Sequence, residues 1–134
     1  MSVNAIVYQR LIERTALTAL VGTRIFPDAL KQDSAYPAVV YGVSSTEAVQ
    51  ATQERSYRVA TVETMVVAET RLAALGAHKE IIAALDRFVG NSGGIVFLHC
   101  LLSNEVSGYD PPAAGTATGT FTESATFSIA YTGD

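Results

Sequence analysis

The strongest constraint on the fold is a strict alternation of side chains near the end of the chain. From Ala125 to Tyr131, apolar side chains alternate with the hydroxyl groups of Thr126 and Ser128. Successive side chains of a strand point to opposite faces, so a period of two residues is typical of a strand. One face of this segment is apolar and the other carries hydroxyl groups. We therefore expect a half-exposed strand over residues 121–131 that pairs in an antiparallel sense with a neighbour.

Three earlier segments also have the composition of strands. Residues 38–43 follow Pro37, which can begin a strand because its missing N–H need not be paired there. Residues 57–67 form a long segment with two alternating faces, and residues 95–102 are apolar on both faces. The second pattern indicates a strand that is covered on two sides.

Two short connections complete the prediction of extended structure. Residues 24–26 form a brief extended piece that Pro27 stops. Residues 44–55 are polar, and they are compatible either with a long turn or with the arms of a hairpin that extends beyond the core.

A helix is predicted over roughly residues 70–89, because apolar side chains recur there at spacings of three, four and seven. That predicted stripe consists of Leu72, Leu75, Ile82, Leu85 and Val89. The glycine-rich residues 90–94 then turn the chain towards the next strand.

The N-terminal segment predicts a helix that is broken. Ala5, Tyr8, Leu11 and Ile12 share one helical face, and a second apolar group begins at Leu17. At 100° per residue, the second group falls on the opposite side of a continuous helix. We therefore expect a kink followed by a short second helix, which ends at Gly22.

The order of these elements is helices, strand, strand, helix, strand, strand, which indicates an α+β fold. We expect a mainly antiparallel sheet of about four strands packed with two main helices. The N-terminal helix is kinked, and a hairpin or loop arm projects from the body. With 134 residues, the chain is expected to form a single domain over residues 1–134.

The composition favours association with other copies. Hydrophobic residues make up 49% of the chain and charged residues only 16%. Large apolar patches rarely stay exposed to water, so we expect an oligomer. The net charge of −4 argues against sequence-specific DNA binding, and all charged side chains after Arg87 are acidic.

The sequence also predicts where the protein resides. The lone cysteine, Cys100, cannot form an intrachain disulfide, which fits a reducing cytoplasm. No apolar run is long enough to cross a bilayer, and the N-terminus lacks the pattern of a signal peptide. We expect neither secretion nor contact with a membrane.

Few residues suggest catalysis. His99 and Cys100 are adjacent in a predicted strand, so they point to opposite faces and cannot form a local pair. We expect His99 in the core or at an interface, Cys100 as a small buried apolar residue, and His78 in solvent on a helix.

Carboxylate pairs and metal ligands give no better candidates. Asp110 and Glu123 flank a predicted loop, and Glu63 and Glu69 have no spacing that brings them together. The glycines of residues 90–94 are not followed by a lysine or by a helix, so they indicate a turn rather than a phosphate loop. The sequence therefore predicts no catalytic residue, no cofactor and no metal site.

Two groups of residues are candidates for contacts between subunits or with partners. Arg10 and Arg14 lie four residues apart on one helical face, where either could bridge Glu13 or a carboxylate of a partner. The second group consists of Glu54, Arg55, Tyr57 and Arg58. Arginine and tyrosine are enriched at interface hot spots, and the preceding residues form the predicted arm.

Two motifs in the first third of the chain are Leu20-Val21-Gly22-Thr23-Arg24-Ile25-Phe26-Pro27 and Tyr36-Pro37-Ala38-Val39-Val40-Tyr41. They carry a resemblance to the tail completion, or tail terminator, proteins of long-tailed bacteriophages. A long strand over residues 58–67, an alanine- and leucine-rich helix over residues 72–88 and a closing alternating strand over residues 127–131 extend it. The pattern departs from the family at residues 65–68, which lack aromatic side chains, and in the long loop before Gly119.

The resemblance implies a structural virion protein and not an enzyme. Such proteins form a ring, commonly a hexamer, that caps the tail tube and contacts the neck of the capsid. The implied partners are sister subunits, the tail tube protein and the neck or head-completion protein, and DNA passes through the ring without specific binding. The implied locations are the head-proximal end of the tail and, during assembly, the host cytoplasm.

Two other functions stay open at this point. One is a neck or head-closure ring protein of the same virion, which would bind capsid portals rather than tail tubes. The other is a small oligomeric α+β ligand-binding domain or enzyme that uses His99 in a pocket.

Overall fold

The computed structural model describes residues 3–30, 35–50, 56–92, 94–111 and 119–133. Within these ranges, three helices and six strands follow one another. In order, they are α1 (Val3–Glu13), α2 (Thr15–Val21), β1 (Ile25–Pro27), β2 (Ala38–Gln50), β3 (Ser56–Ala68), α3 (Arg71–Leu85), β4 (Gly90–Ser92), β5 (Ile95–Asp110) and β6 (Thr120–Thr132). This is the predicted α+β class. None of the helices in these ranges is long and apolar enough to span a membrane.

The strands form one sheet in the order β1-β2-β3-β6-β5-β4. All neighbours are antiparallel except β1 and β2, which run parallel. The expectation of about four strands is therefore too low. The two additional strands, β1 and β4, have three residues each, which is too short to produce a periodic pattern in the sequence.

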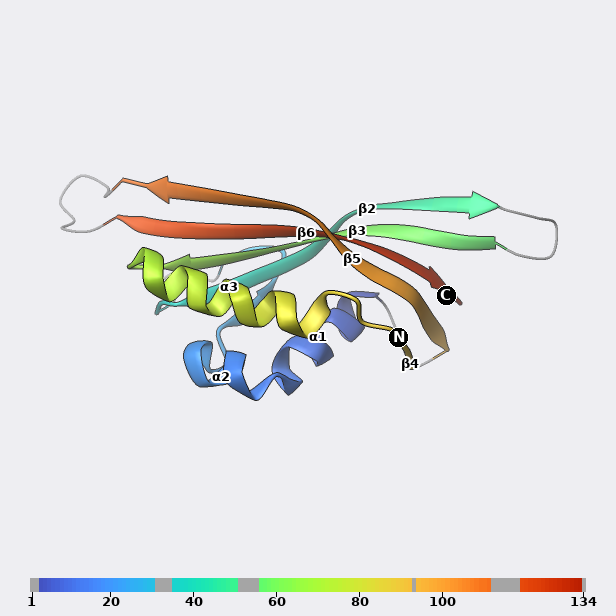
Figure 1. Ribbon diagram of the computed structural model, residues 1–134, viewed down its shortest axis with the longest axis horizontal. Helices are drawn as coiled ribbons and strands as arrows, with labels where there is room; N and C mark the ends of the chain where they lie inside the picture. Colours follow the sequence, from blue (N-terminus) through green and yellow to red (C-terminus); the bar gives the residue numbers. More distant parts are fainter. Residues whose placement is uncertain (1–2, 31–34, 51–55, 93, 112–118, 134) are drawn as a thin grey trace.

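The helices cover only one face of the sheet, and two long hairpins extend from its ends (Figure 1). The β2–β3 hairpin projects on one side of the view and the β5–β6 hairpin on the other. The strand ends of β2 and β3 lie in the polar region for which a turn or hairpin arms were both possible, and the structure has hairpin arms there.

The core lies between the helices and the central strands. Its largest buried side chains include Leu11, Leu17, Ile81, Phe127 and Ile129. The alternation predicted for residues 121–131 is confirmed, because β6 buries its apolar side chains against the helices and leaves its hydroxyl side chains partly exposed.

Strand β5 differs from its prediction. Its residues alternate between buried and exposed, so Val96, Leu98 and Leu101 are exposed on the side where cover was expected. None of the helices that the structure describes lies on that side of the sheet (Figure 1). The apolar sequence of β5 therefore leaves apolar side chains exposed on the uncovered face of the sheet.

Helix α3 buries only part of the predicted stripe, because Leu85 is in the core and Ile82 packs against it, whereas the other three residues are exposed. The buried residues are mainly small, with Ala74, Ala77 and Ala84 beside Ile81 and Leu85. Leu72 is 83% exposed, and Leu75 and Val89 are exposed as well. The helix ends at Leu85 and is followed by the cap residue Asp86, so the expected extension to Val89 is also wrong.

The reason is that α3 contacts the sheet through β3 and β6 and also contacts α1 and α2. Alanines on the buried side allow these layers to approach closely, since the space between packed elements depends on side-chain volume. His78 lies on this side and is buried, so the expectation that it points to solvent is wrong.

The N-terminal break is confirmed. Helix α1 ends at Glu13, Arg14 adopts an extended conformation, and α2 begins at Thr15. Gly22 follows α2 with φ of 60°, a region that glycine adopts easily. The predicted face of α1 is only partly right, because Leu11 is buried whereas Tyr8 and Ile12 are exposed.

Candidate assembly surfaces

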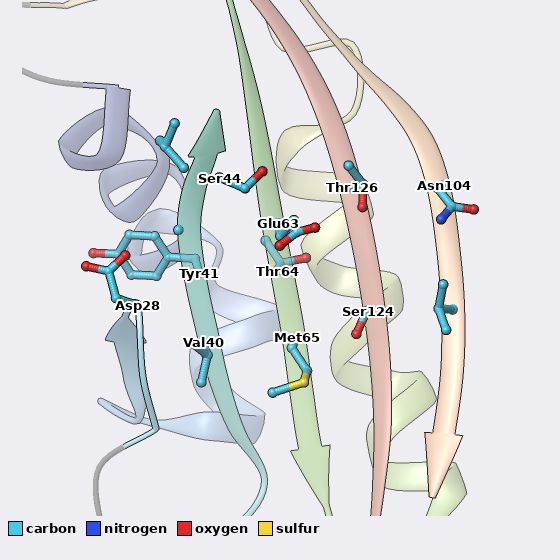
Figure 2. A pocket seen from close by; sticks show the side chains of 13 residues that line it. Asp28, Val40, Tyr41, Ser44, Glu63, Thr64, Met65, Asn104, Ser124 and Thr126 are labelled. Carbon is cyan, nitrogen blue, oxygen red and sulfur yellow. The ribbon is translucent and has the colours of Figure 1, made fainter. Parts of the chain in front are cut away.

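The uncovered face of the sheet contains a groove of about 580 Å³ (Figure 2). Side chains from β2, β3, β5 and β6 line it, together with Asp28 from the segment after β1. Hydroxyl and amide groups dominate its polar lining, for example those of Ser44, Ser124, Thr126 and Asn104.

The charge of this groove has one sign. Asp28 and Glu63 are its charged lining residues, and none of the described residues around it is a lysine or an arginine. Figure 2 shows the Glu63 carboxylate close to the middle of the exposed strands. The surface can form hydrogen bonds but cannot attract phosphate groups by charge.

The arginines that were predicted to contact partners form bonds within the chain. Arg10 donates two hydrogen bonds, of 2.8 and 3.2 Å, to the carbonyl oxygen of Ala84, and its guanidinium lies 4.2 Å from the centre of the Phe88 ring. Arg14 pairs with Glu80 at 3.0 Å. Both contacts connect α1 or the residue after it to α3, and neither involves Glu13.

The candidate group on the β2–β3 hairpin is only partly described. Glu54 and Arg55 lie outside the described residues. Tyr57 and Arg58 lie near the end of the hairpin and line a groove of about 350 Å³ with Val49 and Tyr131. Arg58 is exposed. The structure thus leaves this group as a predicted interface.

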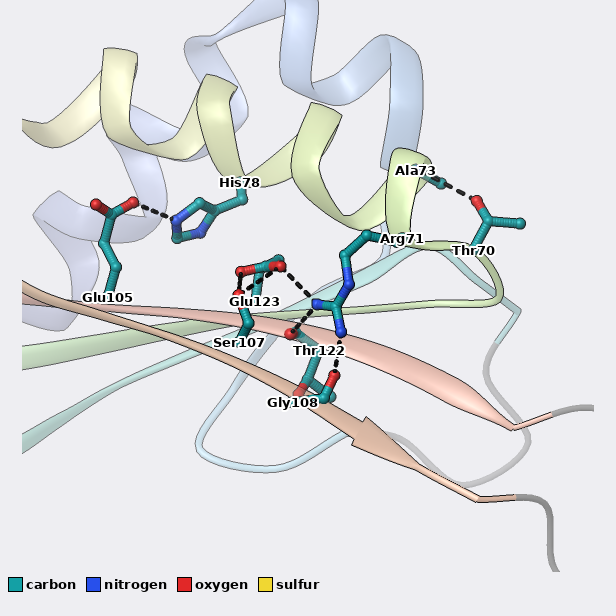
Figure 3. A network of polar contacts seen from close by, with 9 residues as sticks. All are labelled: Thr70, Arg71, Ala73, His78, Glu105, Ser107, Gly108, Thr122 and Glu123. Atoms are coloured by element: carbon teal, nitrogen blue, oxygen red, sulfur yellow. Dashed lines mark hydrogen bonds and ion pairs between the residues drawn. The ribbon is translucent and has the colours of Figure 1, made fainter.

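A partly buried polar network that the sequence did not predict lies under α3 (Figure 3). Glu123 is only 3% exposed, although it was expected beside a loop. Its carboxylate pairs with Arg71 at 2.5 Å and accepts one bifurcated hydrogen bond from the Ser107 hydroxyl, whose oxygen lies 2.9 and 2.7 Å from the two carboxylate oxygens. Arg71 also donates to the carbonyl oxygens of Thr122 and Gly108.

A second polar contact joins the same helix to the same hairpin. The Nε2 atom of His78 lies 2.7 Å from the Glu105 carboxylate. Together, the contacts of Arg71 and His78 connect α3 to both strands of the β5–β6 hairpin (Figure 3). They fix the direction in which this hairpin leaves the body.

The structure gives these residues no arrangement for nucleophilic catalysis. Cys100 is buried, as expected, and burial together with the nearby charge of Asp86 raises the pKa of its thiol to about 12. A thiol with such a pKa carries almost no thiolate at neutral pH. Within the described ranges, no three of the histidines, cysteines and carboxylates come together as metal ligands would.

His99 lies partly buried on β5, and its Nδ1 atom is buried without a hydrogen-bond partner within the described part of the chain. This position agrees with the expected core or interface role. It lies on the strand that exposes apolar residues rather than in the groove.

Comparison with protein families identifies residues 5–111 as matching the tail completion protein gp17 model. A comparison with curated proteins gave no match. Among solved structures, a chain from the virion of a native gene transfer agent particle has a similar fold, with a TM-score of 0.71 and 18% identity. The alignment covers 96% of this chain and 95% of that one.

The family match covers most of the chain and includes the segments around Arg24, Pro37 and α3 on which the sequence resemblance rests. Members of such a family are structural proteins of the phage virion, and the family is not one of enzymes. This chain belongs to the family of phage tail completion proteins related to gp17.

Proposed function

We propose that this protein forms a ring, commonly a hexamer, at the head-proximal end of the phage tail. The ring ends the tail tube and joins it to the neck of the capsid. The observation that carries the proposal is the family match over residues 5–111. The uncovered sheet face and its exposed apolar side chains support it, because assembly would remove such a surface from water.

We propose further that only the groove on the uncovered face lines the channel of the ring, and that the apolar side chains of β5 outside the groove are the part that assembly covers. The groove carries hydroxyl groups and the carboxylates of Asp28 and Glu63, whereas four described arginines are bonded elsewhere within the chain. A channel wall without cations would let DNA pass without the phosphate attraction that retains it on basic surfaces. DNA is therefore a passing partner, not a bound one.

The test is to add the purified protein to tails assembled without it and to image the mixture by negative stain. We expect a ring at one end of each tail, and we expect such tails to join to filled heads. Tails assembled with the protein serve as the positive control.

The competing role is that of a neck or head-closure ring. If the protein decorates purified capsid portals and leaves the ends of tail tubes bare, the terminator role is wrong and the neck role is supported.

A further inference from the structure

The four long strands of the sheet lie in the order β2-β3-β6-β5, and the outer two, β2 and β5, have largely unpaired outer edges. Strand β2 pairs with β1 only over Val39–Tyr41, and β5 pairs with β4 only over Ile95–Phe97. Beyond these short pairings, no strand in the described part of the chain covers the outer edge of either one. Unpaired edges are sites where another strand can add.

The hydrogen bonds of β2 show which of its backbone groups face outward. The N–H of Val39 donates to Arg24, and the carbonyl oxygen of Tyr41 accepts from Asp28, so both residues turn away from β3. In an antiparallel strand, successive residues point their backbone N–H and C=O groups to opposite sides, so those of Val43 also point away from β3. Val62 lies opposite Val43, and its backbone groups therefore bond to β6.

The same alternation continues past the bulge between Val43 and Ser45. Ala60 and Arg58 share the orientation of Val62 because the β3–β6 register is unbroken. Thr46 and Ala48 lie opposite these two residues. Their backbone N–H and C=O groups therefore face the free edge of β2.

The free edge of β5 follows from a similar argument. The N–H of Leu102 donates outward to the Asp86 carboxylate, and Phe127 opposite it therefore bonds to β3. Every second residue of β6 bonds to β3 through its backbone in this way. These residues of β6 lie opposite Glu105, Ser107 and Tyr109. The backbone groups of these three β5 residues thus face outward.

The two free edges share features that permit strand addition, and their charged side chains, Glu47 on one and Glu105 and Asp110 on the other, are all acidic. Residues 45–50 and 104–110 each keep an unbroken register with their inner neighbours, and neither stretch contains lysine, arginine or proline, which commonly protect edges. They lie at opposite edges of the sheet and on the hairpins that project at opposite ends (Figure 1). Each stretch has the length of an ordinary strand.

The strand directions also fit. Strands β2, β3, β6 and β5 alternate in direction, so β2 of a copy related by rotation about the ring axis would run antiparallel to β5. Because the free stretches lie at opposite ends of the strands, pairing them shifts neighbouring sheets along the strand direction. Such a shift between strands is what a sheet needs to close into a barrel.

We propose that residues 104–110 of one copy pair as an antiparallel strand with residues 45–50 of the next copy. The contact is head-to-tail, because two different edges meet, and repetition of such a contact closes a ring. The proposal rests on the ring assembly proposed above and adds the surfaces that make it. The Arg71 network serves this contact, because it fixes the direction of the β5–β6 hairpin.

The test uses two proline variants, one that blocks the free edge of β2 and one that blocks the free edge of β5. Ala48→Pro and Ser107→Pro each remove an outward N–H, and proline is tolerated at the edge of a sheet better than inside it. Ala48→Ser and Ser107→Ala keep the N–H and serve as matched controls. The second control also measures the loss of the hydroxyl that bonds Glu123.

The number of subunits is measured by light scattering, alone and on tail tubes. We expect wild type and both controls to form rings and each proline variant to remain monomeric. A mixture of the two proline variants should stop at a dimer, since it contains one intact pair of edges.

Rings from either proline variant would overturn the edge pairing while leaving the proposed function intact. A dimer from one proline variant alone would show that like edges meet and would overturn the head-to-tail contact. If wild type forms no ring by itself or on tail tubes, the proposed function is wrong and the edge pairing is wrong with it.

A measurement on wild type covers the case in which a proline variant does not fold. Amide hydrogen exchange at the outward-facing residues Thr46, Ala48, Glu105, Ser107 and Tyr109 should slow by about tenfold or more when diluted subunits assemble into rings. Rings in which these residues exchange as fast as in the diluted subunit would contradict the proposal.

Discussion

At the scale of single residues, the described part of the chain buries one carboxylate, that of Glu123, and one thiol, that of Cys100. Glu123 is a buried carboxylate that Arg71 and Ser107 satisfy, and the contact links α3 to two strands. Cys100 is buried in the core among apolar side chains. Each of these residues has an environment whose contribution can be measured.

Replacing Arg71 by methionine should lower the free energy of unfolding by about 2 kcal/mol or more. The variant leaves the Glu123 carboxylate buried without its cation and two carbonyl oxygens without their donor. Urea denaturation measures the change.

Lys79→Met is the matched control, because Lys79 lies on the same helix and is exposed. It should change stability by no more than about 0.5 kcal/mol. Equal effects of the two substitutions would mean that the network does not stabilise the fold.

The Cys100 thiol should make the protein less stable at high pH. Burial raises the pKa of this thiol from 9.0 to about 12, so the folded state holds the proton more tightly than the unfolded state. The stabilisation is fully present below pH 9.0, and it is lost as the pH rises towards 12. Wild type should lose up to about 1.4 kcal/mol per pH unit more than Cys100→Ala in that range.

The free energy of unfolding is measured against pH for wild type and for Cys100→Ala. The contributions of all other titrating groups cancel when the two curves are subtracted. A constant difference across this pH range would show that the thiol has the same pKa in the folded and unfolded states. The constant offset from the smaller alanine side chain does not affect the slope.

At the scale of elements, α3 is the centre of the fold. It contacts the sheet and both N-terminal helices, and Arg10 from α1 donates to its carbonyl oxygen at Ala84. Ala84 belongs to the last turn of the helix, where carbonyl oxygens lack partners within the helix. Arg10 supplies a donor and a positive charge there, as the helix dipole favours.

Arg10→Met should therefore reduce stability by about 2 kcal/mol, since it removes hydrogen bonds from a charged group and a cation–π contact. Arg58→Met is the matched control, because Arg58 is exposed at the hairpin. Thermal unfolding of both variants measures the difference. A loss that is no larger than that of the control would show that Arg10 does not hold α1 against α3.

At the scale of the whole molecule, the sheet has one face covered by helices and one face open (Figure 1). The open face carries the groove with Glu63, and its neighbouring strands end in hairpins with free edges. A molecule of this shape has one side for its own core and another for its assembly. The proposals of a channel surface and of edge pairing both follow from this asymmetry.

Glu63→Lys should make the assembled ring retain DNA, because the substitution places a cation in the groove of every subunit. We expect wild-type rings to release DNA at about 0.15 M salt and variant rings to hold it, with binding that weakens as salt rises. Electrophoretic mobility shift measures the binding.

Glu69→Lys gives the same change in charge at an exposed residue outside the groove. It should bind DNA much more weakly than Glu63→Lys. If the two variants retain DNA equally, the groove on the open face does not line the channel.

The sequence alone predicted those features that depend on residues adjacent in the sequence. The alternation in β6, the break before Thr15 and the burial of Cys100 each follow from a local period or from a residue's own polarity. These properties persist whatever the segment packs against. The resemblance to tail completion proteins was confirmed for the same reason, because it rests on short local motifs.

Only the tertiary structure decided which face of each apolar helix is buried. Helix α3 is apolar on more than one side, and contact with two layers selected its alanines instead of Leu72 and Leu75. The burial of Glu123 and His78 depended on partners distant in sequence, Arg71 and Glu105. A local pattern determines the period of an element, whereas the choice of its buried face depends on the surfaces that meet it.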